Sequence, residues 1–149
     1  MRMPDVNVLI CAHRADDPVH DFYRRWLEQL VAGPEPFALS LEVAVAFVRI
    51  VTHGRFPGGP TPLVQAIAVV DALRQTPGCR TLAAADRHWD LFRRLCEASR
   101  ATGKRVGDAR HAAVAIEHGC TWVTRDPDFQ GFVPAGLRLE LLEPPAHHA

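Results

Sequence analysis

The sequence predicts an α/β fold built on a mostly parallel β-sheet, with helices on both faces of the sheet. Short apolar segments alternate along the chain with longer segments whose apolar residues recur at helical spacing. No dipeptide such as Asn-Gly, which would favour a tight hairpin, joins two of the short apolar segments. Strands that are separated by helices in this way pair in parallel, and the connecting helices cover the sheet.

Length and composition predict one globular domain over residues 1–149, with a frayed tail at about 144–149. The chain has 149 residues, of which 48% are hydrophobic and 23% charged, and these proportions exclude a disordered chain, a collagen and a coiled coil. No apolar stretch approaches the roughly 18 residues of a membrane span. The first residues also lack the pattern of a signal peptide. We therefore expect a cytoplasmic protein with no membrane contact.

Capping residues and glycines mark where the predicted helices start and stop. Asp17, Ser40 and Asp86 are expected to cap helices at their N-termini. Gly33 and Gly119 are expected to end helices. The expected helices cover residues 17–31, 41–53, 61–73, 86–96 and 109–118. The second of these is apolar nearly all round, so we expect it to lie inside the fold.

Short apolar segments between these helices are the predicted strands. They cover residues 37–39, 79–83, 120–124 and 137–142, the last of them at an edge of the sheet. Residues 6–12 are also apolar and, by composition alone, fit a strand. The segment 54–62 is rich in Gly and Pro, which predicts a loop.

The cysteines and the charge balance exclude several classes of function. Cys11, Cys79, Cys96 and Cys120 are far apart, and without a C-x-x-C pair they favour buried free thiols over a zinc site or disulfide exchange. Seventeen basic and seventeen acidic residues leave no net charge, so nucleic-acid binding would need a local patch. Lys104 is the only lysine.

Five acidic residues occupy positions where carboxylates are unusual, and no common nucleotide-binding or hydrolase motif accompanies them. Asp5 interrupts an apolar segment, Glu42 lies in the first turn of a helix expected to be buried, and Asp108 precedes a stripe of alanines. Asp126 and Asp128 directly follow a predicted strand. Strand exits and helix starts share one rim in such a sheet, so we expect these acids to meet there.

Some of these acids also have a structural explanation. Asp108 and Asp126 could cap helices, and Glu42 could favour the positive end of its helix, whereas Asp5 has no such explanation. Together, like charges within about 4 Å repel by about 4 kcal/mol at an effective dielectric constant of about 20. Either protons or a divalent cation must neutralise them. Oxygen ligands without histidine or thiolate favour Mg2+ or Mn2+, which points to phosphodiester hydrolysis.

The segments around these acids resemble those of PIN-domain ribonucleases, especially the toxins of VapBC-type toxin-antitoxin pairs in bacteria. The matching segments are PDVNVLICAHR, LSLEVAVAFVRIVTHGRFP, VGDARHAAVAIEHG and TWVTRDPDF. The similarity covers almost the whole chain. Its most specific part is D-A-x-H-A-A followed by T-x-D-x-D-F.

This resemblance implies a three-layer α/β/α PIN-like fold and Mg2+- or Mn2+-dependent cleavage of RNA. It also implies a homodimer and inhibition by a cognate antitoxin protein that covers the acidic site. The acidic catalytic and metal-binding positions are matched by Asp5, Glu42, Asp108 and Asp126, a further catalytic acid by Asp128, and supporting polar positions by Asn7 and Thr124. The resemblance further implies a turn and short helix, not a strand, over residues 6–12.

Residues that grip RNA are harder to identify. Arg110 and Arg125 flank the acidic motifs and are weak candidates for binding phosphate, with solvated surface arginines as the alternative. Further candidates are Arg14, Arg55 and Arg87. His111 is interpreted as a packed or capping histidine instead of a general base. The tryptophans expected in the core are Trp26, Trp89 and Trp122.

Two alternative functions stay open at this point. One is a PIN-like module that binds a protein or RNA without cleaving it, which predicts no stabilisation by metal ions. The other is a phosphatase or a DNA flap nuclease, although the chain has no aspartyl-phosphate motif and is too short for an added helical arch.

Overall fold

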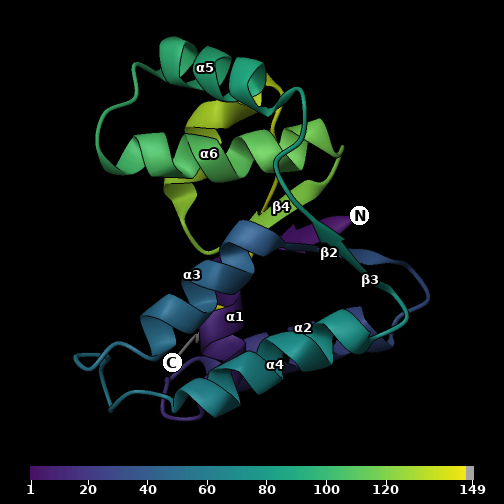
Figure 1. Cartoon of the computed structure of the whole chain (residues 1–149), viewed down its shortest axis with the longest axis vertical. Helices are drawn as coiled ribbons and strands as arrows, with labels where there is room; N and C mark the ends of the chain where they lie inside the picture. The colour runs from purple at the N-terminus through teal and green to yellow at the C-terminus, as the bar shows by residue number, and fades with distance from the viewer. Residues whose placement is uncertain (147–149) are drawn as a thin grey trace.

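In residues 1–146, which the computed structural model describes, five short parallel strands form the centre of the protein (Figure 1). They are β1 (Arg2–Pro4), β2 (Phe37–Ser40), β3 (Cys79–Leu82), β4 (Thr121–Thr124) and β5 (Arg138–Leu141). The hydrogen-bonded order is β1-β4-β5 in one group and β2-β3 in the other, and β2 lies beside β1. The predicted parallel sheet is thus confirmed. The expected frayed tail extends beyond the described residues, at 147–149.

Helices cover the strands on two sides. They are α1 (Val6–His13), α2 (His20–Ala32), α3 (Leu41–Val51), α4 (Leu63–Gln75), α5 (His88–Ser99), α6 (Lys104–Glu117) and the 3-10 segment η1 (Pro127–Ala135). Figure 1 shows α5 and α6 on one side of the strands and α1, α2 and α4 on the other. This is the layered α/β architecture that was predicted. In residues 1–146 no helix has both the length and the apolar character that crossing a membrane requires.

The strand directions bring predicted site residues to one edge of the sheet. β1 and β4 pair in parallel, with Pro4 opposite Val123. Their carboxyl ends therefore lie side by side, and the residues that follow them, Asp5 after β1 and Asp126 just beyond β4, emerge at the same edge. The helix α6 packs against β4 and adds residues of its own to this edge.

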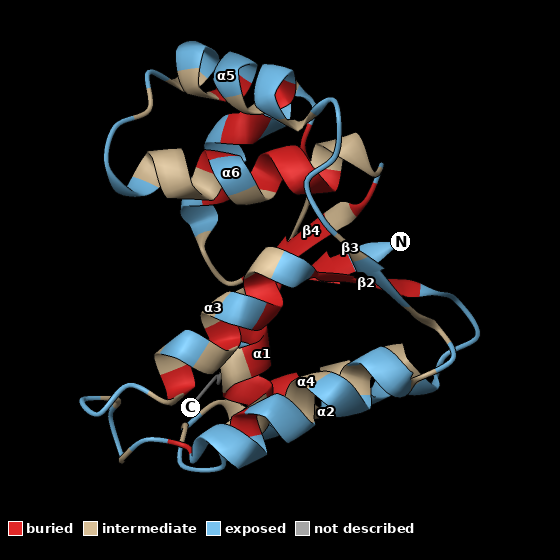
Figure 2. Ribbon diagram, in the orientation of Figure 1, coloured by how far each residue is buried: buried red, intermediate tan, exposed pale blue. Residues whose placement is uncertain are grey.

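Large aromatic side chains fill the core around β4 and α2. Most of β4 is coloured as buried in Figure 2. Trp122 of β4 is fully buried, and the rings of His111 and Phe129 lie with their centroids 5.6 and 5.4 Å from its own. Tyr23 of α2 is also fully buried, and its hydroxyl donates to the carbonyl oxygen of Leu142 at 2.6 Å. This bond fastens α2 to the chain that follows β5. The four free cysteines are buried at Cys11 and Cys120 and half-buried at Cys79 and Cys96.

Residues 6–12 belong to a helix, as the family resemblance implied, and their interpretation as a strand from composition is wrong. The helix α1 begins at Val6 because the carboxylate of Asp5 accepts a hydrogen bond from the Val6 backbone N–H at 2.6 Å. Asp5 is therefore a helix cap, a role that its sequence context did not suggest.

Two further helices begin elsewhere than predicted. The carboxylate of Asp17 accepts from the backbone N–H of Val19 at 2.9 Å and so forms a turn, and α2 begins only at His20. The helix α6 begins at Lys104, one turn before Asp108. Asp108 is therefore inside the helix and does not cap it, so the predicted start of this helix was wrong.

The start of α5 depends on a residue that is distant in the sequence. Asp86 does not cap this helix. The carboxylate of Glu117, at the end of α6, accepts instead from the backbone N–H groups of Ala85 and Arg87, both at 2.8 Å. With the helix held this way, Trp89 is 66% exposed, so its predicted place in the core was wrong.

The helix α3 is buried on one face only. Its Ser40 cap is as predicted, with the hydroxyl 3.5 Å from the backbone nitrogen of Val43, and Phe47 is buried. Leu41 and Val45, however, are 46% and 62% exposed. The expectation that this apolar helix lies wholly inside the fold was therefore wrong, because its packing partners α1, α4 and β2 leave one face open.

Candidate acidic active site

Asp5 lies buried at the carboxyl end of β1, with 5% of the residue exposed. One carboxylate oxygen, Oδ1, accepts from the backbone N–H of Val6 at 2.6 Å. The other, Oδ2, accepts from the hydroxyl of Thr124 at 2.6 Å. Both oxygens are therefore held in a fixed orientation by residues of two different strand ends.

Thr124 links the exits of β1 and β4. Besides donating to Asp5, its hydroxyl oxygen accepts from Nδ2 of Asn7 at 3.2 Å and from the backbone N–H of Asp126 at 3.0 Å. Oδ1 of Asn7 in turn accepts from the backbone N–H of Arg125 at 3.3 Å. Asn7 and Thr124 thus hold the turn that carries Asp126 against the end of β1.

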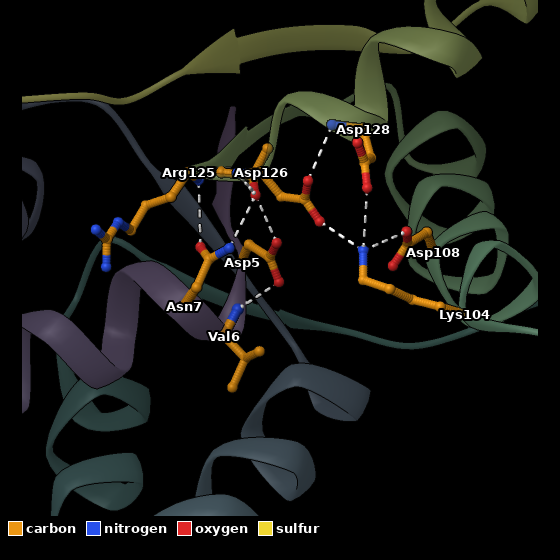
Figure 3. A network of polar contacts seen from close by, with 9 residues as sticks. Asp5, Val6, Asn7, Lys104, Asp108, Arg125, Asp126 and Asp128 are labelled. Carbon is orange, nitrogen blue, oxygen red and sulfur yellow. Dashed lines mark hydrogen bonds and ion pairs between the residues drawn. The ribbon is translucent and has the colours of Figure 1, made fainter. Parts of the chain in front are cut away.

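The ammonium group of Lys104 lies among three carboxylates (Figure 3). Its Nζ is 2.8 Å from Oδ2 of Asp126 and 3.1 Å from Oδ2 of Asp108. Oδ2 of Asp128 is 3.5 Å away. Our sequence interpretation missed this residue, although the spacing K-x-x-x-D places a lysine and an aspartate on one face of a helix.

Asp126 has one structural oxygen and one that faces the cluster. Its Oδ1 accepts from the backbone N–H of Asp128 at 2.9 Å and caps η1, which confirms the capping interpretation. Its Oδ2 points to Lys104. Capping and membership of an acidic cluster are thus compatible in a single carboxylate.

Glu42 lies apart from this network. Its Oε2 is 3.2 Å from Nε of Arg110, as an ion pair without good hydrogen-bond geometry, and 4.0 Å from Nδ1 of His111. Within residues 1–146, no hydrogen bond or ion pair links Glu42 directly to the other four acids. The structure therefore joins four of the five predicted acids in one network and leaves the fifth beside it.

The carboxylates of the network differ in their affinity for protons. Burial raises the pKa of Asp5 from 3.8 to about 6. The two hydrogen bonds that Asp5 accepts oppose this rise, and the negative charges of Asp108 and Asp126 add to it. Burial is the largest single influence on the pKa of Asp126 and acts to raise it, but the hydrogen bonds from Lys104 and the Asp128 backbone, together with the positive charges of Lys104 and Arg105, hold this pKa below the usual value.

His111 packs against the core beside the acidic residues. Burial, and then the positive charge of Arg110, lower the pKa of His111 to about 4, so the ring is neutral at pH 7. The ring stacks on Trp122 with 5.6 Å between centroids. The structure thus confirms that His111 is a packed histidine.

The raised pKa of Asp5 predicts a pH dependence of stability in the metal-free protein. Because the folded state binds this proton more tightly than the unfolded state, the stabilisation is complete below about pH 4 and is lost as the pH rises through about 6. A rise of roughly two pKa units corresponds to about 3 kcal/mol. In urea unfolding with EDTA, the stability of Asp5→Asn relative to wild type should therefore increase by about this amount between pH 4 and pH 7.

The matched control is Asp90→Asn, which changes an exposed acid on α5. Its stability profile should run parallel to that of the wild type. Parallel profiles for Asp5→Asn as well would show that Asp5 does not gain a proton on folding.

The ligand chemistry of the network suits a hard divalent cation. Asp5, Asp108, Asp126 and Asp128 present only carboxylate oxygens, which Mg2+ and Mn2+ prefer. A cation, the ammonium of Lys104, already lies within 3.5 Å of three of them. Among the residues that the structure describes, no three His, Cys, Asp or Glu side chains are yet arranged as a complete ligand set. Two observations therefore support a divalent cation here: the four side chains offer only oxygen ligands, and the ammonium of Lys104 already lies between three of them.

The arginines considered for RNA binding face in different directions. Arg110 lies at the rim in its ion pair with a carboxylate of α3. The guanidinium of Arg125 lies over the ring of Tyr23, 5.0 Å from its centroid, and 2.8 Å from Sγ of Cys11. It is thus turned toward α1 and α2 and away from the acids (Figure 3). Arg14 is held by the backbone of a neighbouring loop.

A parallel α/β fold with acids gathered at the carboxyl ends of β1 and β4 is what a PIN domain presents. The chain belongs to the PIN domain family, whose sequence profile matches residues 2–132.

Relatives in this family are named as ribonucleases. Ribonuclease VapC25 of Mycobacterium tuberculosis is 38% identical to this chain over 132 residues, which cover 89% of this chain and 93% of the relative. VapC ribonuclease Mb2897 of Mycobacterium bovis is 41% identical over 128 residues, which cover 86% of this chain and 87% of the relative. The chain is thus similar over most of its length to VapC ribonucleases.

Solved structures share the fold at low sequence identity. VapBC2 from Rickettsia felis, bound to a DNA fragment from its promoter, matches with a TM-score of 0.68 at 20% identity and covers 93% of this chain and 96% of that one. VapC20 of Mycobacterium tuberculosis, described as a toxin that cleaves the sarcin-ricin loop, matches with a TM-score of 0.66 at 19% identity and covers 97% and 100%. At these identities the likeness concerns the fold.

Proposed function

We propose that this chain is a metal-dependent endoribonuclease that hydrolyses RNA phosphodiester bonds, and that it is the toxin of a type II toxin-antitoxin system. The observation that carries the proposal is the meeting of Asp5, Asp108, Asp126 and Asp128 in one network at the carboxyl ends of the strands. The similarity to VapC ribonucleases supports RNA as the substrate.

Each residue of the site has a distinct part in this proposal. Asp5, Asp108 and Asp126 hold Mg2+ or Mn2+, and Asp128 positions water at the outer side of the cluster. When bound, a divalent ion of this kind supplies a water of lowered pKa and stabilises charge that develops on the phosphate. The hydroxyl of Thr124 keeps a carboxylate oxygen of Asp5 in place at 2.6 Å.

Glu42 and Arg110 are paired with each other at the edge of the site, so their proposed roles depend on one another. Their ion pair, with 3.2 Å between Oε2 and Nε, occupies both side chains. Release of this pair would free Glu42 to join the ligands and Arg110 to bind a phosphate of the RNA. Arg125 is the weaker candidate for RNA contact, because its guanidinium is held against Cys11 and Tyr23.

The proposed partners follow from the same family. One solved structure with this fold is described as a toxin-antitoxin complex, from Klebsiella pneumoniae. We propose a cognate antitoxin that covers the acidic site, a homodimer of this chain, and one PIN-like unit over residues 1–149. We also propose a cytoplasmic location, because RNA is the proposed substrate.

Removal of the metal is the direct test of the proposed activity. Protein freed of antitoxin should cleave structured RNA with Mg2+ or Mn2+ and should stop when EDTA is added. The ion should also raise the thermal unfolding midpoint, since an ion at about 100 times its Kd stabilises the folded state by about 2.7 kcal/mol. Sodium chloride at the same ionic strength is the control for charge screening.

A different result would favour the non-catalytic alternative. If the folded protein binds RNA or antitoxin while divalent ions cause neither cleavage nor stabilisation, the chain is a PIN-like binding module. Cleavage that persists in EDTA would contradict the metal dependence alone.

A further inference from the structure

The side chain of Lys104 points toward the acidic network, a direction that its exposure to solvent does not require. Its side chain is 66% exposed, yet its ammonium turns inward to within 2.8, 3.1 and 3.5 Å of three carboxylates. An exposed lysine could point into water at little cost, because surface ion pairs contribute at most about 1 kcal/mol. The inward direction thus reflects the concentrated negative charge of the cluster.

We propose that Lys104 is a built-in competitor of the divalent cation. Its ammonium takes the place between Asp108, Asp126 and Asp128 while the ion is absent and withdraws when the ion binds. Lys104 thereby weakens metal binding and sets the ion concentration at which the site loads. This inference rests on the proposed metal-dependent function.

The contacts of Lys104 coincide with oxygens that the metal requires. The ammonium contacts Oδ2 of Asp108, of Asp126 and of Asp128. Oδ1 of Asp126 is already engaged by a backbone N–H, so Oδ2 is the oxygen of this residue that is free of the backbone. A divalent cation and an ammonium cannot share these oxygens, because like charges within about 4 Å repel strongly.

The position of Lys104 in the fold allows it to withdraw. It is the first residue of α6, and its flexible stem has little packing to lose because 66% of the side chain is exposed. Withdrawal therefore breaks only the ion pairs, and the helix itself stays in place. A purely structural role as a helical pair with Asp108 would stabilise the protein slightly without affecting the metal.

Metal titration of charge variants tests the proposal. K104M removes the charge and keeps an unbranched side chain, and K104R keeps the charge. R93M is the matched control, because Arg93 is also an exposed helical cation paired with an acid four residues later, Glu97 at 3.9 Å. By calorimetry without RNA, K104M should bind Mn2+ about tenfold more tightly than wild type, a difference that shrinks at high salt. K104R and R93M should stay close to wild type.

A second readout uses the fact that Lys104 is the only lysine of the chain. In wild-type protein, Mg2+ should increase the rate at which an amine-reactive ester acylates Lys104 severalfold, since the ion releases the ammonium from the carboxylates. The α-amino group of Met1 serves as the internal reference, and mass spectrometry of the peptides measures both. In Asp108→Asn, where metal binding is weakened, Mg2+ should change the labelling of Lys104 much less.

The outcomes separate this inference from the proposed function. If wild type binds Mn2+ and cleaves RNA, but K104M binds with unchanged affinity or Mg2+ leaves the labelling of Lys104 unchanged, the competitor role is wrong and the ribonuclease proposal stands. If neither wild type nor K104M binds a divalent ion, the proposed metal-dependent function is wrong, and the inference falls with it.

Discussion

Asp108→Asn is expected to reduce RNA cleavage by at least about a hundredfold while the protein stays folded. The side chain of Asp108 is 15% exposed and presents Oδ2 to the centre of the acidic network. Asparagine has the same shape but lacks the negative charge that a divalent cation needs. Even residues that only orient metal ligands cost about 10- to 100-fold when they are changed, so loss of a ligand should cost at least the upper value.

Initial cleavage rates at a Mg2+ concentration that saturates the wild type measure this effect, with circular dichroism as the check on folding. Asp90→Asn, which changes an exposed acid of α5, should cleave at the wild-type rate. An Asp108→Asn variant with both normal cleavage and normal metal affinity would remove Asp108 from the active site.

Trp122→Ala is expected to lower the free energy of unfolding by about 3–5 kcal/mol. The side chain is fully buried on β4, between His111 and Phe129, and it is the largest fully buried side chain of residues 1–146. Truncation therefore loses apolar burial and leaves a cavity beside the strand whose end carries the acids. Urea unfolding at neutral pH in EDTA measures the change.

Two variants make this stability experiment specific. Trp89→Ala should change the free energy of unfolding by less than about 0.5 kcal/mol, because Trp89 is 66% exposed. Trp122→Phe keeps a ring and removes an indole N–H that has no hydrogen-bond partner in the described residues, so it should cost under about 1.5 kcal/mol. Equal losses from Trp89→Ala and Trp122→Ala would contradict the burial difference between them.

The meeting of Asp5 and Asp126 was predictable because it depends on strand direction. Asp5 and Asp126 follow strands that run in parallel, so any correct assignment of these strands brings the two acids to one edge. Lys104 was not predictable from strand exits, since its place depends on α6 beginning one turn before Asp108. Glu42 was predicted as a metal ligand, yet its carboxylate forms an ion pair with Arg110 of a different helix.

Local patterns in the sequence were sufficient for the parallel α/β architecture, for most helix and strand positions and for the meeting of four of the five predicted acids. Apolar periodicity and capping residues act over a few neighbours, and they are therefore readable along the chain. The tertiary structure alone decided that Glu117 holds the start of α5, that Trp89 faces solvent and that Lys104 enters the acidic network. Each of these features depends on which distant segments of the chain come into contact. The burial of a side chain and its ion-pair partners are fixed only when the chain has folded.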